Sequence, residues 1–324
     1  MRKKYVKQKK SHFKINFLLI IFLIFAIVKI PEVYSAGFNN LKFAQISDAH
    51  FSNYEKNTSF KMLESSPDLL DDAIDQVNST PKINFVMFTG DLINMPYEKQ
   101  LNAFIKHANK LCCPWYATFG NHDISIGGYL SKKTYFDIIR SQNPDFTTTE
   151  RYYSFVPKRG YKAIALDTTI DSEMTSQGII DEEQLAWLDN ELKSAKNSVI
   201  IIFMHVPIKQ PYKSDNHRLR NSEEVLALLN KYNNPMVICS GHYHSVKVFQ
   251  QGNKLFVASP SLVSFPNAFR IVNINSQKNK IIVDLYLKET RLEEVQMRAK
   301  LRIIGSSLLY GEENDRNATY ELKR

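Results

Sequence analysis

The sequence has little cysteine, no internal repeat and no low-complexity linker. Its three cysteines, Cys112, Cys113 and Cys239, form no Cys-x-x-Cys pair, which argues against the usual zinc and dithiol redox motifs. Cys239 falls in an apolar run, where we expect a small core residue, and a disulfide to Cys112 or Cys113 in an oxidising compartment is the alternative. Without repeats or linkers, the 324 residues favour one large domain.

Acidic residues are missing from residues 1–30, which hold eight Lys or Arg. The whole chain has a formal charge of +9, but removing these eight from its 42 basic residues leaves 34 against 33 acidic residues. The excess positive charge therefore belongs to the N-terminus. Because a nucleic-acid-binding face needs a basic patch on the folded domain, the sequence indicates no nucleic-acid partner.

Residues 1–36 predict a signal peptide or an N-terminal membrane anchor. Seven basic residues in Met1–Lys14 precede an apolar stretch of fourteen residues, Ile15–Val28. That length suits a signal-peptide core and is shorter than the roughly 18 apolar residues of a spanning helix. Small residues near position 36 offer a cleavage site, but Lys29 after the apolar core leaves an uncleaved anchor as the alternative. Because the basic flank stays in the cytoplasm, we expect an extracytoplasmic protein, located in the periplasm, in the cell envelope or secreted.

Short apolar runs rich in β-branched or aromatic residues predict five strands, at Leu41–Ile46, Ile83–Phe88, Trp115–Phe119, Val199–Phe203 and Met236–Cys239. Continuous apolarity is typical of strands buried on both faces. Helical spacing of apolar residues predicts helices at Asp68–Val77, Asp181–Lys193 and Ser222–Leu229. Beyond them, strands are expected at Val246–Gln250, Leu255–Ala258, Phe269–Ile274 and Ile281–Leu287. The segment from Arg291 is predicted to begin as a helix and to end as a loose polar tail.

Potential metal ligands follow the five strands in five short motifs. In chain order these are Asp48-Ala49-His50, Gly90-Asp91, Gly120-Asn121-His122-Asp123, His205 and Gly241-His242-Tyr243-His244. Because loops that leave parallel strands converge at one edge of a sheet, we expect the motifs to meet there. They supply enough ligands for two adjacent divalent metals and leave one histidine free for chemistry. Mixed nitrogen and oxygen donors suit Mn, Fe, Zn or Co better than Ca, which prefers oxygen cages.

In order and spacing, the five motifs resemble those of the calcineurin-like metallophosphoesterases, and the resemblance extends from about Lys42 to Ser259. It implies an α/β fold, a two-sheet β-sandwich flanked by helices. It also implies a metallophosphoesterase domain at residues 37–290 and a C-terminal extension at 291–324 that packs on the domain or trails it.

The same resemblance implies a role for each motif residue. Two divalent transition metal ions (Mn, Fe or Zn) would share Asp91 as the bridging carboxylate, and the other ligands would be Asp48, His50 and His244 in one site and Asn121, His205 and His242 in the other. Such a pair clamps a phosphoryl group and activates a bridging water that attacks phosphorus. His122 resembles the histidine that stabilises the transition state and protonates the leaving oxygen.

Some of these residues have simpler explanations. Asn121 could be a turn residue, and Asp123 could cap a helix. His12 and His107 are expected to be ordinary surface or core histidines. One departure from the family pattern bears on catalysis, because Asn94 replaces an aspartate that often pairs with the catalytic histidine.

Differences from other branches of the family narrow the choice of branch for this chain. The purple acid phosphatases have a tyrosine where this chain has Asn94, and they lack the equivalent of His50. The protein phosphatases have an arginine shortly after Gly90-Asp91, and it is missing here. The large 5′-nucleotidases need a further substrate domain, whereas only 80 residues follow His244. The chain resembles the compact branch that includes bacterial class III cyclic-nucleotide phosphodiesterases, although export weighs against a role in cyclic-nucleotide signalling.

We expect a small phosphorylated substrate, with monoester and diester both open. The loops Ile124–Arg159 and Lys209–Arg220 are expected to lie over the site, and His217 and Arg218 in the second loop are candidate substrate-binding residues. A solvated basic loop is the alternative for that segment. A non-catalytic binding or scaffolding module on the same fold is the rival function, but every expected ligand position is filled. The oligomeric state is not predicted.

Overall fold

The computed structural model describes residues 39–124, 130–303 and 305–324. The predicted signal peptide or anchor lies outside the described residues. The chain forms two units, Met1–Gly37 and Phe38–Arg324, and all of the described residues belong to the second. Among the described residues, no helix combines the length and apolarity needed to span a bilayer.

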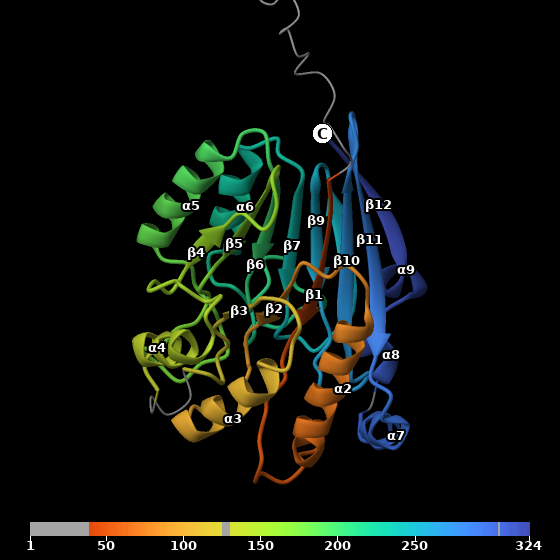
Figure 1. Ribbon diagram of the computed structural model, residues 1–324. Coiled ribbons are helices and arrows are strands. Elements are labelled where there is room, and N and C mark those ends of the chain that lie inside the picture. The colour runs from red at the N-terminus through yellow and green to blue at the C-terminus, as the bar shows by residue number, and fades with distance from the viewer. Residues whose placement is uncertain (1–38, 125–129, 304) are drawn as a thin grey trace, which may run out of the picture. The chain divides into compact units, whose positions relative to one another are not determined.

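The first of two six-stranded sheets carries three of the motifs (Figure 1). Its order is β12-β11-β10-β1-β2-β3. The parallel strands are β1 (Asn39–Ile46), β2 (Phe85–Thr89) and β3 (Trp115–Thr118). Strands β10 (Ala268–Ser276), β11 (Lys280–Glu289) and β12 (Ala318–Lys323) extend the sheet antiparallel from β1. The carboxyl ends of β1, β2 and β3 therefore meet at one edge.

The second sheet carries the other two motifs, and its order is β4-β5-β6-β7-β9-β8. The four parallel strands are β5 (Tyr161–Ala165), β6 (Val199–Phe203), β7 (Met236–Ser240) and β9 (Lys254–Ala258). The antiparallel edge strands are β4 (Tyr153–Phe155) and β8 (Lys247–Gln251).

Helices cover the outer face of each sheet. On the first sheet these are α2 (Ser66–Ser79, after the short 3-10 helix Leu63–Ser65), α3 (Glu98–Ala108), α4 (Lys132–Gln142) and α7 (Glu293–Leu301). On the second they are α5 (Glu182–Ser194) and α6 (Ser222–Asn230). Two short helices, α8 (Ser306–Tyr310) and α9 (Glu313–Arg316), lead to β12. The predicted fold class, a two-sheet sandwich flanked by helices, is confirmed.

The continuous apolar runs serve two hydrophobic cores at once. In β6, Ile201 and Phe203 face the core between the sheets, whereas Ile200 and Ile202 pack against the helices on the outer face. Side chains alternate across a strand, so a strand buried on both faces needs apolar residues at every position. Cys239 lies in the inter-sheet core, and all three cysteines are free.

Two expectations about the less regular segments are wrong. The predicted polar tail contains β12, which pairs with β11 and buries Leu322 against the inter-sheet core. Its polar residues alternate with Tyr320 and Leu322, which is the pattern of a half-buried edge strand. The predicted long loop Ile124–Arg159 contains α4 and β4 instead.

Candidate metal centre

Each motif lies in the loop that follows a strand, and hydrogen bonds join these loops to one another. The main-chain N–H of Asp48 donates to the carbonyl of Gly90 at 3.1 Å, and that of His50 donates to Asp91 at 2.8 Å. A similar bond joins the loops that follow β6 and β7. The potential ligands are therefore held by connected main chain at one edge of the sandwich.

Several of these residues adopt a main-chain conformation that non-glycine residues rarely use. Positive φ angles occur at Asp48 (52°), His50 (37°), Asp91 (50°), His242 (70°) and His244 (50°). Such conformations cost free energy and persist where the surrounding structure enforces them, which is typical of functional sites. The strain is concentrated on the predicted ligands.

The motif glycines make room for the carboxylates. A Cβ atom at Gly120 would collide with the main-chain nitrogen and Oδ1 of Asp91. At Gly241 it would collide with Ser47 Oγ and Asp48 Oδ2. These motifs therefore need glycine because the main chain passes directly against a carboxylate.

One group of ligand atoms surrounds the ring of His205. Its Nδ1 lies 2.9 Å from the Thr89 carbonyl, to which a neutral ring donates its proton. Its Nε2 then presents a lone pair, 3.1 Å from His242 Nδ1 and 3.2 Å from Asn121 Oδ1. Asp91 Oδ2 lies 3.5 Å from the same nitrogen. Acceptors this close need a cation or a proton between them.

A second group forms around His244. Its Nε2 lies 3.2 Å from His50 Nε2 and 3.3 Å from Asp48 Oδ1. His50 Nε2 in turn lies 3.5 Å from Asp91 Oδ2. On the other side of the His244 ring, Nδ1 is 3.0 Å from Ser264 Oγ, which orients the ring. The second group is thus also a set of converging acceptors.

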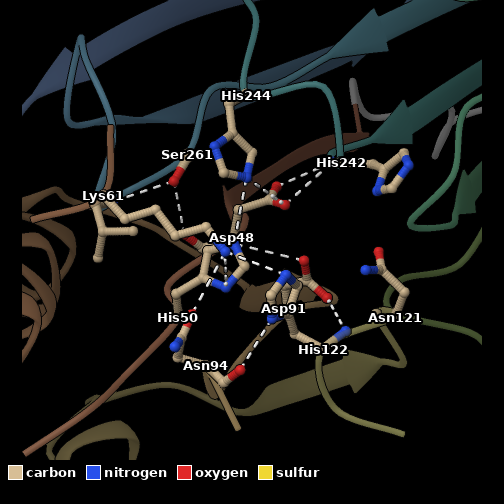
Figure 2. Close-up of polar contacts among 12 residues, drawn as sticks. Asp48, His50, Lys61, Asp91, Asn94, Asn121, His122, His242, His244 and Ser261 are labelled. Carbon is tan, nitrogen blue, oxygen red and sulfur yellow. Dashed lines mark hydrogen bonds and ion pairs between the residues drawn. The ribbon is translucent and has the colours of Figure 1, made fainter. Parts of the chain in front are cut away.

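Asp91 belongs to both groups. Its Oδ2 is 3.5 Å from His50 Nε2 and 3.5 Å from His205 Nε2, while its Oδ1 accepts the main-chain N–H of His122 at 2.8 Å. Figure 2 shows Asp91 between the side chains of the two groups. Carboxylate, amide and imidazole donors together fit divalent transition metals. The residues present therefore fit a pair of metal sites that share Asp91.

Metal binding should depend on pH because of His205. Burial lowers the pKa of His205, but the carboxylates of Asp91 and Asp48 outweigh it and raise the pKa to about 9. Because this pKa is raised above the ordinary value, the ring holds its proton at pH 7 and loses it only as the pH passes through 9. A metal must displace that proton.

We therefore expect the affinity of the metal-free protein for Zn²⁺ to rise by about tenfold per pH unit between pH 6 and 8. The pKa values of His50 and His242 are held well below the ordinary value, chiefly by burial, so these rings release no proton. Calorimetric titration in buffers of different ionisation enthalpy measures the released proton. An affinity that does not change with pH would contradict the assignment.

His122 is oriented by main chain rather than by a carboxylate. Its Nδ1 lies 2.9 Å from the carbonyl oxygen of Asn94, so a neutral ring donates there and leaves Nε2 for proton exchange. The main-chain carbonyl of Asn94 therefore accepts the hydrogen bond from His122 that an aspartate side chain often accepts in the family. Burial, helped by the charge of Lys61 and opposed by that of Asp91, lowers the pKa of His122 to about 4.

Lys61 is a site residue that the sequence did not indicate. Its side chain is buried, with Nζ 3.1 Å from His122 Nε2, 3.2 Å from His50 Nδ1 and 3.4 Å from Asn94 Oδ1. Burial lowers the pKa of Lys61 to about 8, against the opposing charges of nearby carboxylates. The only local hint of its burial is its position between Phe60 and Met62, because a lysine among apolar residues is prone to burial.

Replacing Lys61 by methionine should strengthen metal binding. The substitution keeps an unbranched chain and removes a positive charge next to His50, so we expect metal affinity to rise by about tenfold or more. Lys56→Met is the matched control, since the Lys56 side chain is 88 % exposed and pairs with Glu64. Calorimetric titration compares both variants with wild type. Unchanged affinity in Lys61→Met would mean that the amine is uncharged when metal is bound.

A cavity of about 280 Å³ opens over the centre. Asp91, Asn121, His122, His242 and His244 line it from the motifs, and Lys61 and His217 add nitrogen atoms.

Of the two candidate substrate-binding residues, His217 lines the cavity and Arg218 does not. His217 lines this cavity, with its ring centroid 5.3 Å from that of His242. Arg218 is exposed and is not among the described residues that line the cavity.

Asp123 and His107 make contacts that account for them without a role in metal binding. The buried carboxylate of Asp123 accepts the main-chain N–H groups of Gly120 and Ile93 at 2.9 and 3.1 Å, and so closes the loop after β3 rather than capping a helix. His107 pairs with Asp71 at 2.7 Å, outside the two ligand groups. His12 lies outside the described residues.

Comparisons with known proteins agree with this arrangement. The sequence model of the calcineurin-like phosphoesterase family matches residues 41–246. A probable cyclic nucleotide phosphodiesterase from Xenorhabdus bovienii is 25 % identical over 69 % of this chain and 87 % of that protein. A probable glycerophosphodiester phosphodiesterase from Arcobacter nitrofigilis is 28 % identical over 67 % of this chain and 77 % of that protein.

A solved structure is similar in fold. The crystal structure of a dimetal phosphatase from Danio rerio superposes with a TM-score of 0.61, at 16 % identity, over 75 % of this chain and 95 % of that one. At this identity the similarity concerns the fold alone.

Proposed function

Because this chain belongs to the calcineurin-like phosphoesterase family, it is a metal-dependent phosphoester hydrolase, and we propose that it cleaves phosphodiesters at a centre of two divalent metal ions. The observation that carries the proposal is the position of Asp91. One oxygen of its carboxylate faces a histidine nitrogen of each ligand group at the same distance, 3.5 Å. A shared carboxylate is what two neighbouring metal sites require.

When bound, two divalent metals supply Lewis-acid polarisation of the phosphoryl oxygens and a lowered pKa for water. The protein supplies position and proton transfer. His122 lines the cavity, with Nδ1 fixed by the Asn94 carbonyl and Nε2 3.1 Å from the Lys61 amine, and we propose that a proton passes from Nε2 to the leaving oxygen. The negative charge of a bound substrate favours the protonated ring.

The shortage of free cations favours diesters over monoesters. A monoester dianion carries more charge than a diester and needs more positive contacts. Of the described residues that line the cavity, none is an arginine, and the amine of Lys61 is already in contact with two histidines. In the basic loop, Lys213 and Arg218 are exposed and Arg220 pairs with Glu173 at 2.7 Å.

The rival function, a non-catalytic binding module, predicts a damaged site. Here the carboxylates, the amide and the ligand histidines are all present, with neighbouring ligand atoms 3.1–3.5 Å apart, and His122 lies beside them. This arrangement favours the enzyme.

A second proposal concerns the location of the enzyme and rests on the N-terminal sequence. We propose that residues 1–36 direct the protein out of the cytoplasm, as a cleaved signal or as an anchor, and that 37–290 and 291–324 form the catalytic domain and its C-terminal extension. The basic flank and apolar core of residues 1–28 support the export.

The proposal is tested with metal-stripped full-length protein reloaded with Mn²⁺, Zn²⁺ or Fe²⁺. We expect metal-dependent hydrolysis of bis(p-nitrophenyl) phosphate, with a kcat/KM at least about tenfold above that for p-nitrophenyl phosphate, because one missing cationic contact is worth about that factor. Preference for the monoester would contradict the diester assignment. Metal binding without hydrolysis of either ester would favour the binding module.

A further inference from the structure

Part of the cavity is lined by side chains that phosphate chemistry does not need. Phe60, Ile303 and Leu309, here called the apolar wall, line the same cavity as the motif histidines. The Phe60 ring centroid lies 6.1 Å from that of His244, so the wall begins directly beside a predicted ligand. Phe60 is also 44 % exposed. An exposed ring at this place has apolar surface available for a ligand.

The wall is fixed in place by the C-terminal segment. Val246, two residues after His244, donates its main-chain N–H to the carbonyl of Leu309 at 2.8 Å. Ser245 Oγ donates to the carbonyl of Leu308 at 2.9 Å. These bonds hold α8 against the loop that carries His244.

A further bond fixes the end of α7 near Phe60. Arg302 donates to the carbonyl of Thr58 at 2.7 Å. Two loops that carry predicted ligands are therefore linked through the C-terminal segment, and the wall is a built feature of the site.

We infer that the apolar wall binds an apolar alcohol of the phosphodiester, an alkyl or aryl group, and so selects the substrate class. The inference rests on the proposed phosphodiesterase activity. A charged or sugar-like alcohol would leave its hydrogen-bonding groups unpaired against Phe60, Ile303 and Leu309, whereas an alkyl or aryl group removes apolar surface from water on both sides.

Such a diester has two possible sources. It can be a soluble ester with an alkyl or aryl alcohol, or a lipid whose phosphodiester is presented at a membrane surface. Leu308 and Leu301, in the same segment, are 55 % and 81 % exposed. The shared chemistry is the apolar alcohol, and the experiment separates the sources.

The test compares p-nitrophenyl methyl phosphate with p-nitrophenyl hexyl phosphate, which share a leaving group and differ in the second alcohol. Each buried CH₂ group contributes about fourfold to kcat/KM, so partial burial of a hexyl chain should give a preference of at least about tenfold. In Leu309→Ser and Ile303→Ser the ratio of the two kcat/KM values should fall toward unity. Leu308→Ser, one residue from Leu309 and outside the described cavity lining, is the control and should keep the wild-type ratio.

Thermal unfolding checks that each variant is folded, and Leu309→Ala serves if the serine variant is not. Equal wild-type rates on both esters would overturn the inference and leave the phosphodiesterase in place. Turnover of neither ester would overturn the proposed function itself. Given a hexyl preference, cleavage of a phosphatidyl p-nitrophenyl diester in vesicles assigns the lipid source, and failure to cleave it assigns the soluble one.

Discussion

Replacing His122 by alanine is expected to lower kcat for a phosphodiester by about 10²–10⁴-fold, the usual contribution of a positioned acid–base group. The ring is oriented by the Asn94 carbonyl and lines the cavity, so its loss removes the proposed proton donor for the leaving oxygen. Metal content should stay at the wild-type value, because His122 is in neither proposed ligand set. Steady-state kinetics and elemental analysis of the purified variant measure both quantities.

The control for this substitution is His107→Ala. His107 is also partly buried and also hydrogen-bonded, but its partner is Asp71 and it lies outside both ligand groups. It should keep the wild-type kcat. A His122→Ala variant with normal kcat, or one that loses its metal, would show that the histidine is not the acid–base group.

Asp91→Asn is expected to lower kcat by on the order of 10³-fold or more, because the metal pair contributes several kcal/mol to the transition state. The amide is the right size but cannot satisfy the site in either orientation. If its NH₂ takes the position of Oδ2, the nitrogen has no lone pair to offer a metal shared with His50 or His205; if it takes the position of Oδ1, it opposes the main-chain N–H of His122. Kinetics together with metal analysis should show a loss of both activity and metal.

Asp72→Asn separates this effect from the general loss of a buried carboxylate. Asp72 is 9 % exposed and accepts two hydrogen bonds from Arg291, outside the ligand groups. It should retain its metal and its kcat even if its free energy of unfolding falls. An Asp91→Asn variant with normal metal content and turnover would remove Asp91 from the bridging position.

The parts of the fold that sequence predicts well are those whose pattern is set by burial alone. The run Val199–Phe203 is predicted as a strand with the observed bounds of β6, because every one of its residues packs into a core. Strand β12 is missed because its polar residues conceal one buried position, Leu322. Whether such an edge strand forms depends on its pairing with β11, and the local sequence of β12 does not reveal that partner.

The site residues also divide into those that the local sequence predicts and those that it does not. The motif residues could be predicted because each stands directly after a strand, and the strand fixes where its loop begins. Lys61 and Leu309 could not, since their place depends on how distant segments fold back over the strand ends. Arg218 illustrates the converse, because a basic loop near the site does not determine which side chains face the cavity.

The sharing of Asp91 between two metal ions is tested most directly by electron paramagnetic resonance of the Mn²⁺-loaded protein. Two Mn²⁺ ions bridged by one carboxylate, about 3.5–4 Å apart, couple their spins. We expect two Mn²⁺ per chain and the spectrum of a coupled pair, which should be lost in Asp91→Asn. One Mn²⁺ per chain, or two ions with the spectrum of isolated Mn²⁺, would contradict the shared site.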